Sequence, residues 1–325
     1  MALFRTLTAG DVNEILRGFG LPPATAHAPI PVGTINTNVR VETAGGRFFL
    51  RINEGKAEDD VEREAAIIAH LAGRGVPTPT PLRAADGARY LRWHDEIASL
   101  FPWLDGRTLS RAELTPEHAR AVGQALAALH VAGTDFPDRR SGRYEPHDID
   151  RRLTAVAELQ HPELADAVAT LEPELSALRV ERRPNLPEGL IHGDLFIDNV
   201  MFAAGDQPAL RALIDFEQAA WGRLSYDLAV TTLAFGYGRD DFRPEIVAAL
   251  FDGYTAVRAP TADERVAFEA ELRFAACRFA VTRITDVHLR RAEGAAPGKD
   301  FRRYLARLAS VKAHLARQSP LLALP

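Results

Sequence analysis

The sequence predicts an α+β fold in two parts, a small β-rich part at the N-terminus and a larger, mainly helical part after it. Strand patterns with turn signals are concentrated before residue 102, where one helix accompanies them. Helical apolar stripes dominate from about residue 115 onward, and a short β region over residues 190–216 interrupts them. The proline at position 102 ends the last early strand, so we expect domains over residues 1–101 and 102–325.

The N-terminal part combines strand alternation with one amphipathic helix. Val39 and Val41 alternate with polar neighbours, and a glycine pair after them marks a turn into a second strand. A helix is expected over residues 59–72, because apolar residues recur there at offsets of four, seven and eleven. Two further apolar segments, residues 90–91 and 97–101, complete the predicted strands.

Helix start signals recur in the C-terminal part. Thr115 followed by proline predicts an N-cap with proline at the first helical position. Thr261 with Glu264 makes a capping box that opens a long helix, and its apolar stripe continues to Phe279. The β region between these helices is dense in polar residues, which makes it the place to look for chemistry.

Composition and charge narrow the class of protein. The chain has 325 residues, a net charge of −5 and 46% hydrophobic residues, so one large or two medium domains are expected. Charges of both signs are interspersed, which predicts no nucleic-acid partner, and no apolar run is long enough for a membrane span. The N-terminus shows no secretory signal, and the single cysteine, Cys277, has no partner for an internal disulfide. We therefore expect a soluble, cytoplasmic protein.

The strongest functional signal is a run of polar residues, His192-Gly193-Asp194-Leu195-Phe196-Ile197-Asp198-Asn199, followed downstream by Ile214-Asp215-Phe216. A short apolar strand before the run delivers Asp194 onto a loop. Two apolar stretches after Asn199, joined by a turn, predict a hairpin whose return brings Asp215 back beside Asn199. Each residue alone is an ordinary turn former, but the combined spacing predicts a catalytic site.

These residue types suit phosphoryl transfer. Two carboxylates and an amide at one mouth supply the oxygen ligands that Mg²⁺ prefers. Because phosphoryl transfer needs mainly positioning and charge neutralisation, metal ligands and one base are sufficient. In this interpretation Asp194 accepts the proton of the acceptor hydroxyl, and Asn199 and Asp215 hold the metal ions. His192 braces the loop.

The spacing is similar to that of a known enzyme family, the phosphotransferases that include aminoglycoside, choline and type II homoserine kinases. Their loop reads H-G/A-D-x-x-x-x-N with a downstream I-D-F, and residues 192–199 and 214–216 match it without a gap. Residues 226–229 resemble the family's Y-D-L-A, in which the aspartate, here Asp227, helps to brace the catalytic loop; a helix N-cap is the structural alternative. The resemblance implies a two-lobed protein-kinase-like fold with ATP as the phosphoryl donor.

The nucleotide side is expected in the N-terminal part. No P-loop motif occurs in the sequence. By the resemblance, the turn that contains Gly33, Asn36 and Asn38 stands in the place of the nucleotide loop. The family also expects a basic residue on the third strand and a glutamate on the next helix, here Arg51 and Glu64. This pair would hold the α- and β-phosphates, with arginine in place of the usual lysine; a solvated arginine and glutamate are the alternative.

The segment Phe101-Pro102-Trp103-Leu104 resembles the connection between the two lobes of this family. Its backbone groups are expected to bond adenine, and Phe101 and Trp103 are expected to help enclose the ring. A buried strand end is the structural alternative.

The acceptor is indicated by further matches to type II homoserine kinases. Residues 129–137, 272–286 and 299–305 resemble segments of that subgroup, so the resemblance covers most of the chain. It implies transfer to L-homoserine, giving O-phospho-L-homoserine for threonine biosynthesis. The segment after the metal aspartate, residues 217–221, differs from the aromatic-rich segment of that subgroup.

An amino-acid acceptor needs an acid for its ammonium group and a cation for its carboxylate. Glu217 or Asp286 is the predicted acid, and Arg278 or Arg283 is the predicted cation. Ordinary ion pairs along a helix are the alternative for both arginines.

Two other hypotheses remain open on the sequence alone. The acceptor is instead an aminoglycoside, a choline-like alcohol or a sugar, although the acids of residues 141–181 are interleaved with arginines, which argues against a polycation. The other is a non-catalytic binding module with a kinase fold. Such proteins usually lack the base or a metal ligand, whereas Asp194, Asn199 and Asp215 are all present.

Overall fold

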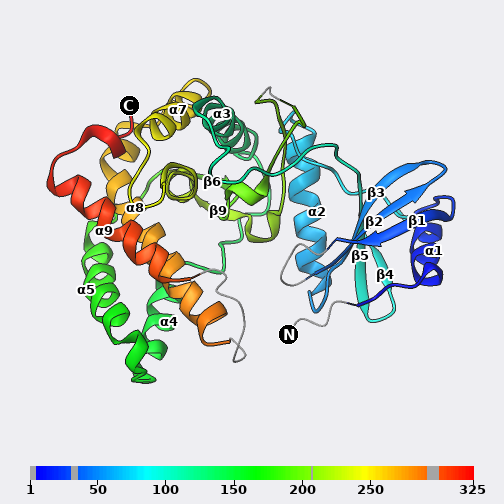
Figure 1. Cartoon of the computed structure of the whole chain (residues 1–325), viewed down its shortest axis with the longest axis horizontal. Coiled ribbons are helices and arrows are strands. Elements are labelled where there is room, and N and C mark those ends of the chain that lie inside the picture. Colours follow the sequence, from blue (N-terminus) through cyan, green and yellow to red (C-terminus); the bar gives the residue numbers. More distant parts are fainter. Residues whose placement is uncertain (1–4, 31–35, 206–207, 291–299) are drawn as a thin grey trace. The chain divides into compact units, whose positions relative to one another are not determined.

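The structure is a computed structural model that describes residues 5–30, 36–205, 208–290 and 300–325 (Figure 1). The chain divides into two compact units. Unit 1 comprises Met1–Arg107 and Ile214–Glu217, and unit 2 comprises Thr108–Leu213 and Gln218–Pro325. The division falls after Arg107 rather than at the expected position after residue 101, and a four-residue segment from the middle of the sequence joins unit 1.

Unit 1 is built on a five-stranded antiparallel sheet with the strand order β1-β2-β3-β5-β4. Its elements are α1 (Ala9–Gly18), β1 (Ala24–Pro29), β2 (Thr37–Thr43), β3 (Gly46–Ile52), α2 (Glu58–Ala72), β4 (Leu91–Trp93) and β5 (Glu96–Pro102). The predicted strands and the helix after them are present. Two elements that the sequence analysis did not identify, α1 and β1, complete the unit.

The core of unit 1 lies between α1 and the sheet. Val12, Ile15 and Leu16 of α1 are fully buried and cluster with the alternating apolar residues of β2 and β3. The helix begins at a capping box in which Thr8 accepts from the Asp11 amide and Asp11 accepts from the Thr8 amide. Burial on this scale contributes about 1.5–3 kcal/mol for each large apolar side chain.

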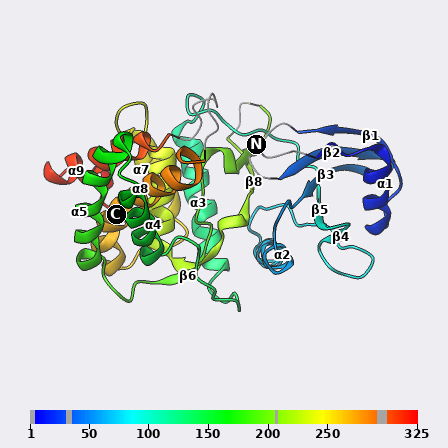
Figure 2. The ribbon, with the colours of Figure 1, turned by 90° about the horizontal axis from the view of Figure 1, so that it is seen from below.

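Unit 2 is mainly helical (Figure 2). Its helices are α3 (Pro116–Ala132), α4 (Pro146–Glu158), α5 (Ala165–Glu181), α6 (Leu224–Thr231), α7 (Pro244–Thr255), α8 (Ala262–Arg283) and α9 (Arg302–Ala316). Its strands form two short antiparallel pairs, β6 (Glu188–Ile191) with β9 (Ala220–Arg223) and β7 (Val200–Phe202) with β8 (Leu210–Leu213). A small β-rich unit and a larger helical unit agree with the predicted α+β class.

Both predicted helix starts in unit 2 are present. Thr115 caps α3 with Pro116 as its first residue, and Thr261 forms a capping box with Glu264 at the start of α8. Across the described parts of the chain, no helix combines the length and apolar character that crossing a bilayer requires.

Candidate active site

The predicted catalytic loop lies in unit 2, directly after β6. Gly193 adopts a φ of 75°, the left-handed region that favours glycine. A Cβ at this position would lie 2.8 Å from the carbonyl oxygen of Gln218, so the backbone passes too closely for any side chain. The glycine between His192 and Asp194 therefore serves the path of the loop.

Asp227 of α6 holds the start of this loop. Its carboxylate accepts hydrogen bonds from the backbone amides of His192 (2.7 Å) and Gly193 (2.8 Å). His130 of α3 contacts the same carboxylate through Nε2 at 3.0 Å, and its Nδ1 lies 2.7 Å from the Tyr254 hydroxyl. Burial raises the pKa of the Asp227 carboxyl, but the contacts with His130 and His192 outweigh burial and lower it below its usual value. These bonds are what bracing the loop requires.

Asp194 and Asn199 are linked inside the loop. The Asn199 side-chain amide donates from Nδ2 to the backbone oxygen of Asp194 at 2.8 Å, which leaves Oδ1 as the amide atom for other partners. The Asp194 side chain remains 26% exposed, as an aspartate that meets a substrate must. Arg278 of α8, which is 4% exposed, places Nη1 3.6 Å from Asp194 Oδ1.

The predicted hairpin after Asn199 is present in unit 2. Val200 pairs with Leu213 across β7 and β8. Asn199 immediately precedes this pair, and Asp215 follows it by two residues. Asp215 belongs to unit 1 and has a φ of 66°, an uncommon conformation for a residue with a side chain.

The predicted pair of Arg51 and Glu64 is present as a contact in unit 1. Arg51 of β3 places Nη1 3.0 Å from Glu64 Oε1 of α2, and their side chains are only 13% and 9% exposed. The exposure is too low for the solvated arginine and glutamate that were the alternative. Burial lowers the pKa of Arg51, but the charges of Glu64, Glu217 and Asp215 outweigh it and raise the pKa above its usual value.

The structure adds a second cation, Lys56, that the sequence analysis missed. Lys56 Nζ lies 2.6 Å from Glu217 Oε1 and 3.6 Å from Glu64 Oε2. Arg51 also reaches Glu217, at 3.6 Å, and Asn36 donates to it from Nδ2 at 2.6 Å. Burial opposes ionisation of Glu217, but Lys56 and Arg51 lower its pKa below the usual value. We call Arg51, Lys56, Glu64 and Glu217 the unit 1 charge network.

The remaining nucleotide-side predictions have mixed outcomes. Gly33 lies outside the described residues. Asn38 stands opposite Arg51 in the register of β2 and β3. Phe101 of β5 is buried and contacts Phe49, with ring centroids 6.1 Å apart. The Trp103 amide donates to the Arg47 oxygen at 3.0 Å, so this amide continues the β3–β5 pairing and is not available to adenine.

The four predicted acceptor residues have different partners in the structure. Glu217 is already paired in unit 1, which argues against a role in binding an ammonium group. Asp286, in a helical segment over Ile284–His288, pairs with Arg152 at 2.7 Å. Arg283 donates to the Asp300 backbone oxygen at 3.1 Å, and burial lowers its pKa. Of the four, Arg278 is the one that contacts the predicted base.

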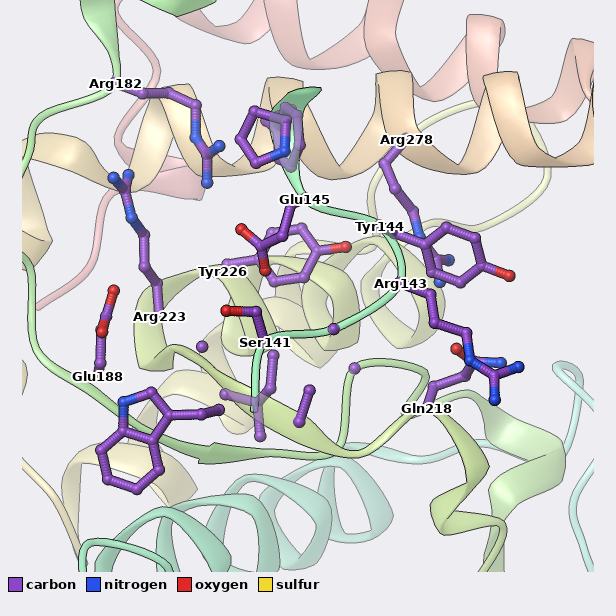
Figure 3. Close-up of a pocket in the computed structure, with 18 residues that line it drawn as sticks. Ser141, Arg143, Tyr144, Glu145, Arg182, Glu188, Gln218, Arg223, Tyr226 and Arg278 are labelled. Carbon is purple, nitrogen blue, oxygen red and sulfur yellow. The ribbon is translucent and has the colours of Figure 1, made fainter. Parts of the chain in front are cut away.

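Unit 2 contains a cavity of about 180 Å³ beside the catalytic loop (Figure 3). Gly193 and Arg278 line it, together with Glu145, Arg182, Arg223 and Trp221. Glu271 of α8 is fully buried and pairs with Arg182 at 2.6 Å and Arg223 at 2.9 Å. Arg182 and Arg223 therefore have their counter-ion within the fold.

A buried arginine–glutamate pair beside an antiparallel sheet and a braced His-Gly-Asp loop in a helical unit are features of a kinase-like phosphotransferase. Comparison with known proteins agrees. The profile of the phosphotransferase enzyme family matches residues 27–268. The chain is 30% identical over 301 residues to the homoserine kinase of Methylobacillus flagellatus, covering 92% of each protein. It is 33% identical over 291 residues to the homoserine kinase of Rhizobium meliloti, covering 88% of this chain and 87% of that one.

A solved structure supports the fold. Spectinomycin phosphotransferase, crystallised with ADP and spectinomycin, superposes with a TM-score of 0.73 at 13% identity, covering 95% of this chain and 99% of that one. The fold is thus the two-lobed protein-kinase-like fold. The chain belongs to the phosphotransferase enzyme family.

Proposed function

We propose that this phosphotransferase transfers the γ-phosphoryl group of ATP to the hydroxyl of L-homoserine, giving O-phospho-L-homoserine and ADP. The observation that carries the acceptor is the similarity to homoserine kinases at 30–33% identity along most of the chain. A role in threonine biosynthesis, in the cytoplasm, is part of this proposal.

The proposed chemistry rests on Asp194. The acceptor oxygen forms a bond to the γ-phosphorus as the bond between that phosphorus and the leaving ADP oxygen breaks. The proton of the hydroxyl passes to the Asp194 carboxylate, which the loop holds partly exposed. Asp227 and His192 act on the loop rather than on the substrate, because Asp227 accepts from its backbone amides.

Asn199 and Asp215 each offer an oxygen donor of the kind that Mg²⁺ prefers. Asn199 uses Nδ2 within the loop, so its Oδ1 is left as an oxygen ligand, and Asp215 supplies a carboxylate. A Mg²⁺ ion held by these two residues would neutralise charge on the transferred phosphoryl group. We assign the phosphates of ATP to Arg51 and Lys56, which Glu64 and Glu217 hold in place.

The remaining nucleotide contacts are proposed by the family resemblance. Gly33, Asn36 and Asn38 belong to the proposed nucleotide loop. Phe101 and Trp103 would supply apolar surface to adenine, since the Trp103 amide is already bonded to Arg47.

The runner-up acceptors are aminoglycosides, choline-like alcohols and sugars. The cavity in unit 2 is lined by four arginines and two glutamates, Arg143, Arg182, Arg223, Arg278, Glu145 and Glu188. This charge balance disfavours a polycation and suits an acceptor that carries a carboxylate.

A coupled assay of ADP formation with homoserine, choline and kanamycin tests the acceptor. Of the three acceptors, we expect only homoserine to be phosphorylated, with a turnover of about 1–100 s⁻¹. Formation of O-phosphohomoserine, checked by mass spectrometry, excludes simple ATP hydrolysis. A wild-type enzyme that turns over kanamycin or choline and leaves homoserine unchanged would contradict the proposal.

A further inference from the structure

Arg278 is a buried cation whose hydrogen bonds are incomplete. Its guanidinium lies 4.1 Å from the ring centroid of Tyr144 and 3.8 Å from that of Phe279. Among the described residues, the carboxylate that it meets is Asp194, at 3.6 Å, and its buried Nε has no hydrogen-bond partner. A buried cation without a full set of partners is costly, so an anion from outside would be bound favourably.

Glu145 lines the same cavity, and its carboxyl would be stabilised in the ionised form by a cation. It is the residue before α4, but its side chain makes no capping hydrogen bond. Burial raises the pKa of its carboxyl, and the positive charge of Arg182 opposes the rise without cancelling it. Figure 3 shows Arg278 reaching from α8 beside the Tyr144 ring, and Glu145 on the loop that follows Ser141. A cation placed in the cavity would favour the ionised form of Glu145.

We propose that this cavity binds the amino-acid end of the acceptor, with Arg278 on its carboxylate and Glu145 on its ammonium group. The assignment rests on the proposed function. Both groups sit on the same carbon of homoserine, and two methylene groups separate that carbon from the hydroxyl oxygen. The cavity is lined by Gly193, the neighbour of Asp194, so an acceptor anchored here presents its hydroxyl towards the base.

The other arginines of the cavity are poorer candidates for the carboxylate. Arg182 makes a two-point contact with Glu271, at 2.6 and 3.2 Å, and its guanidinium covers the Phe274 ring at 3.8 Å. Arg223 shares the same glutamate. Recruiting either would disturb a buried ion pair, whereas Arg278 has donors to spare.

The test compares homoserine with two acceptors that each lack one charged group. 3-Aminopropan-1-ol lacks the carboxylate, and 4-hydroxybutanoate lacks the ammonium group. We expect Arg278→Gln to lower the preference of kcat/KM for homoserine over 3-aminopropan-1-ol by about 10- to 100-fold. Glu145→Gln should lower the preference for homoserine over 4-hydroxybutanoate by a similar factor. Because each result is a ratio, any effect on Asp194 that is common to both acceptors cancels.

Matched controls come from exposed charges of unit 2 that do not line the cavity. Arg120 and Glu245 have side chains that are 50% and 52% exposed, so Arg120→Gln and Glu245→Gln make the same charge changes away from the proposed site. Both ratios should stay within about threefold of wild type, as expected for exposed charges. Where Arg278→Gln folds poorly in a thermal melt, Arg278→Lys keeps the charge but loses the planar fork, and should still weaken the preference.

Two outcomes would overturn the inference. A parallel loss of activity on homoserine and 3-aminopropan-1-ol in Arg278→Gln would mean that Arg278 serves Asp194 and not the carboxylate. An unchanged ratio for 4-hydroxybutanoate in Glu145→Gln would remove Glu145. Failure of the proposed function is distinct, because the wild-type enzyme would then leave homoserine unphosphorylated before any variant is compared.

Discussion

The unit 1 charge network and the catalytic loop of unit 2 both bury charged side chains, but they satisfy them differently. In unit 1, Arg51 and Lys56 each contact both Glu64 and Glu217, so two cations face two carboxylates. In unit 2, the buried carboxylate of Asp227 is satisfied largely by backbone amides, and Arg278 is left with one distant carboxylate.

The difference indicates which charged groups hold parts of the protein in position and which can bind a ligand. A closed network such as that of unit 1 fixes its cations before a ligand arrives, which reduces the reorganisation needed on binding. A brace made from backbone amides fixes the path of a loop. An incompletely paired cation such as Arg278 has capacity left for a ligand. The following experiments break each of these arrangements in turn.

The largest effect is expected from the base. Asp194→Asn removes the proton acceptor but keeps the shape of the side chain, so kcat should fall by about 10²- to 10⁴-fold. The variant should still unfold in one cooperative thermal transition, at a melting temperature lowered by a few degrees because the buried Arg278 loses the carboxylate that it meets. Turnover at the wild-type rate would show that Asp194 is not the base.

Breaking the backbone brace should cost stability. Asp227→Asn leaves one of the two loop amides without an acceptor and removes a buried partner of His130, so we expect about 3 kcal/mol less free energy of unfolding. Denaturant unfolding measures it. Thr231→Ser, on the same helix, is the control.

The same variant has a defined pH dependence. The native pKa of Asp227 lies below its usual value. The ionised carboxylate therefore adds its full contribution to the free energy of unfolding above about pH 4, and this contribution is lost as the pH falls towards the native pKa. The stability difference between wild type and Asp227→Asn should therefore narrow below about pH 4. A difference that widens there would contradict the lowered pKa.

Removing a carboxylate from the unit 1 charge network should weaken the binding of ATP and leave the binding of homoserine unchanged. Glu217→Gln removes the counter-ion that Lys56 and Arg51 share, so the KM for ATP should rise by about tenfold. The KM for homoserine should stay unchanged, because Glu217 is committed to unit 1. An altered KM for homoserine with a normal KM for ATP would restore Glu217 to the acceptor site.

The smallest effect is expected from an exposed pair in unit 1. Arg47 and Asp105 lie 2.7 Å apart, but their side chains are 50% and 73% exposed. Asp105→Asn should change the free energy of unfolding by less than about 1 kcal/mol, because water screens the pair. A larger loss of unfolding free energy would mean that the distance between the charged atoms, and not their burial, determines how much an ion pair stabilises this protein.

What the sequence revealed depended on how local the signal was. The caps at Thr115 and Thr261 use contacts three residues apart, so they were predictable from the sequence. The capping box at Thr8 carried the same kind of signal for α1 and was overlooked. The contact between Arg51 and Glu64 followed from a family pattern, and the structure bears out the contact itself.

Long-range contacts were not predictable in this way. Lys56 lies in the turn between β3 and α2, and nothing in the sequence nearby points to Glu217, 161 residues later. The contact of Arg278 with Asp194 likewise joins residues 84 positions apart. Which of several arginines on a helix meets a loop depends on the rotation of that helix in its packing, and the sequence alone does not set this.

The segment Ile214–Glu217 has a practical consequence for anyone who divides this enzyme. It belongs to unit 1, although more than a hundred residues of unit 2 precede it. A fragment that stops at Arg107 lacks Glu217, so Lys56 keeps only its longer contact and Asn36 loses its acceptor. A chimaera that exchanges N-terminal parts between relatives must therefore transfer these four residues as well. Otherwise Lys56 and Asn36 meet the other parent's residue at position 217.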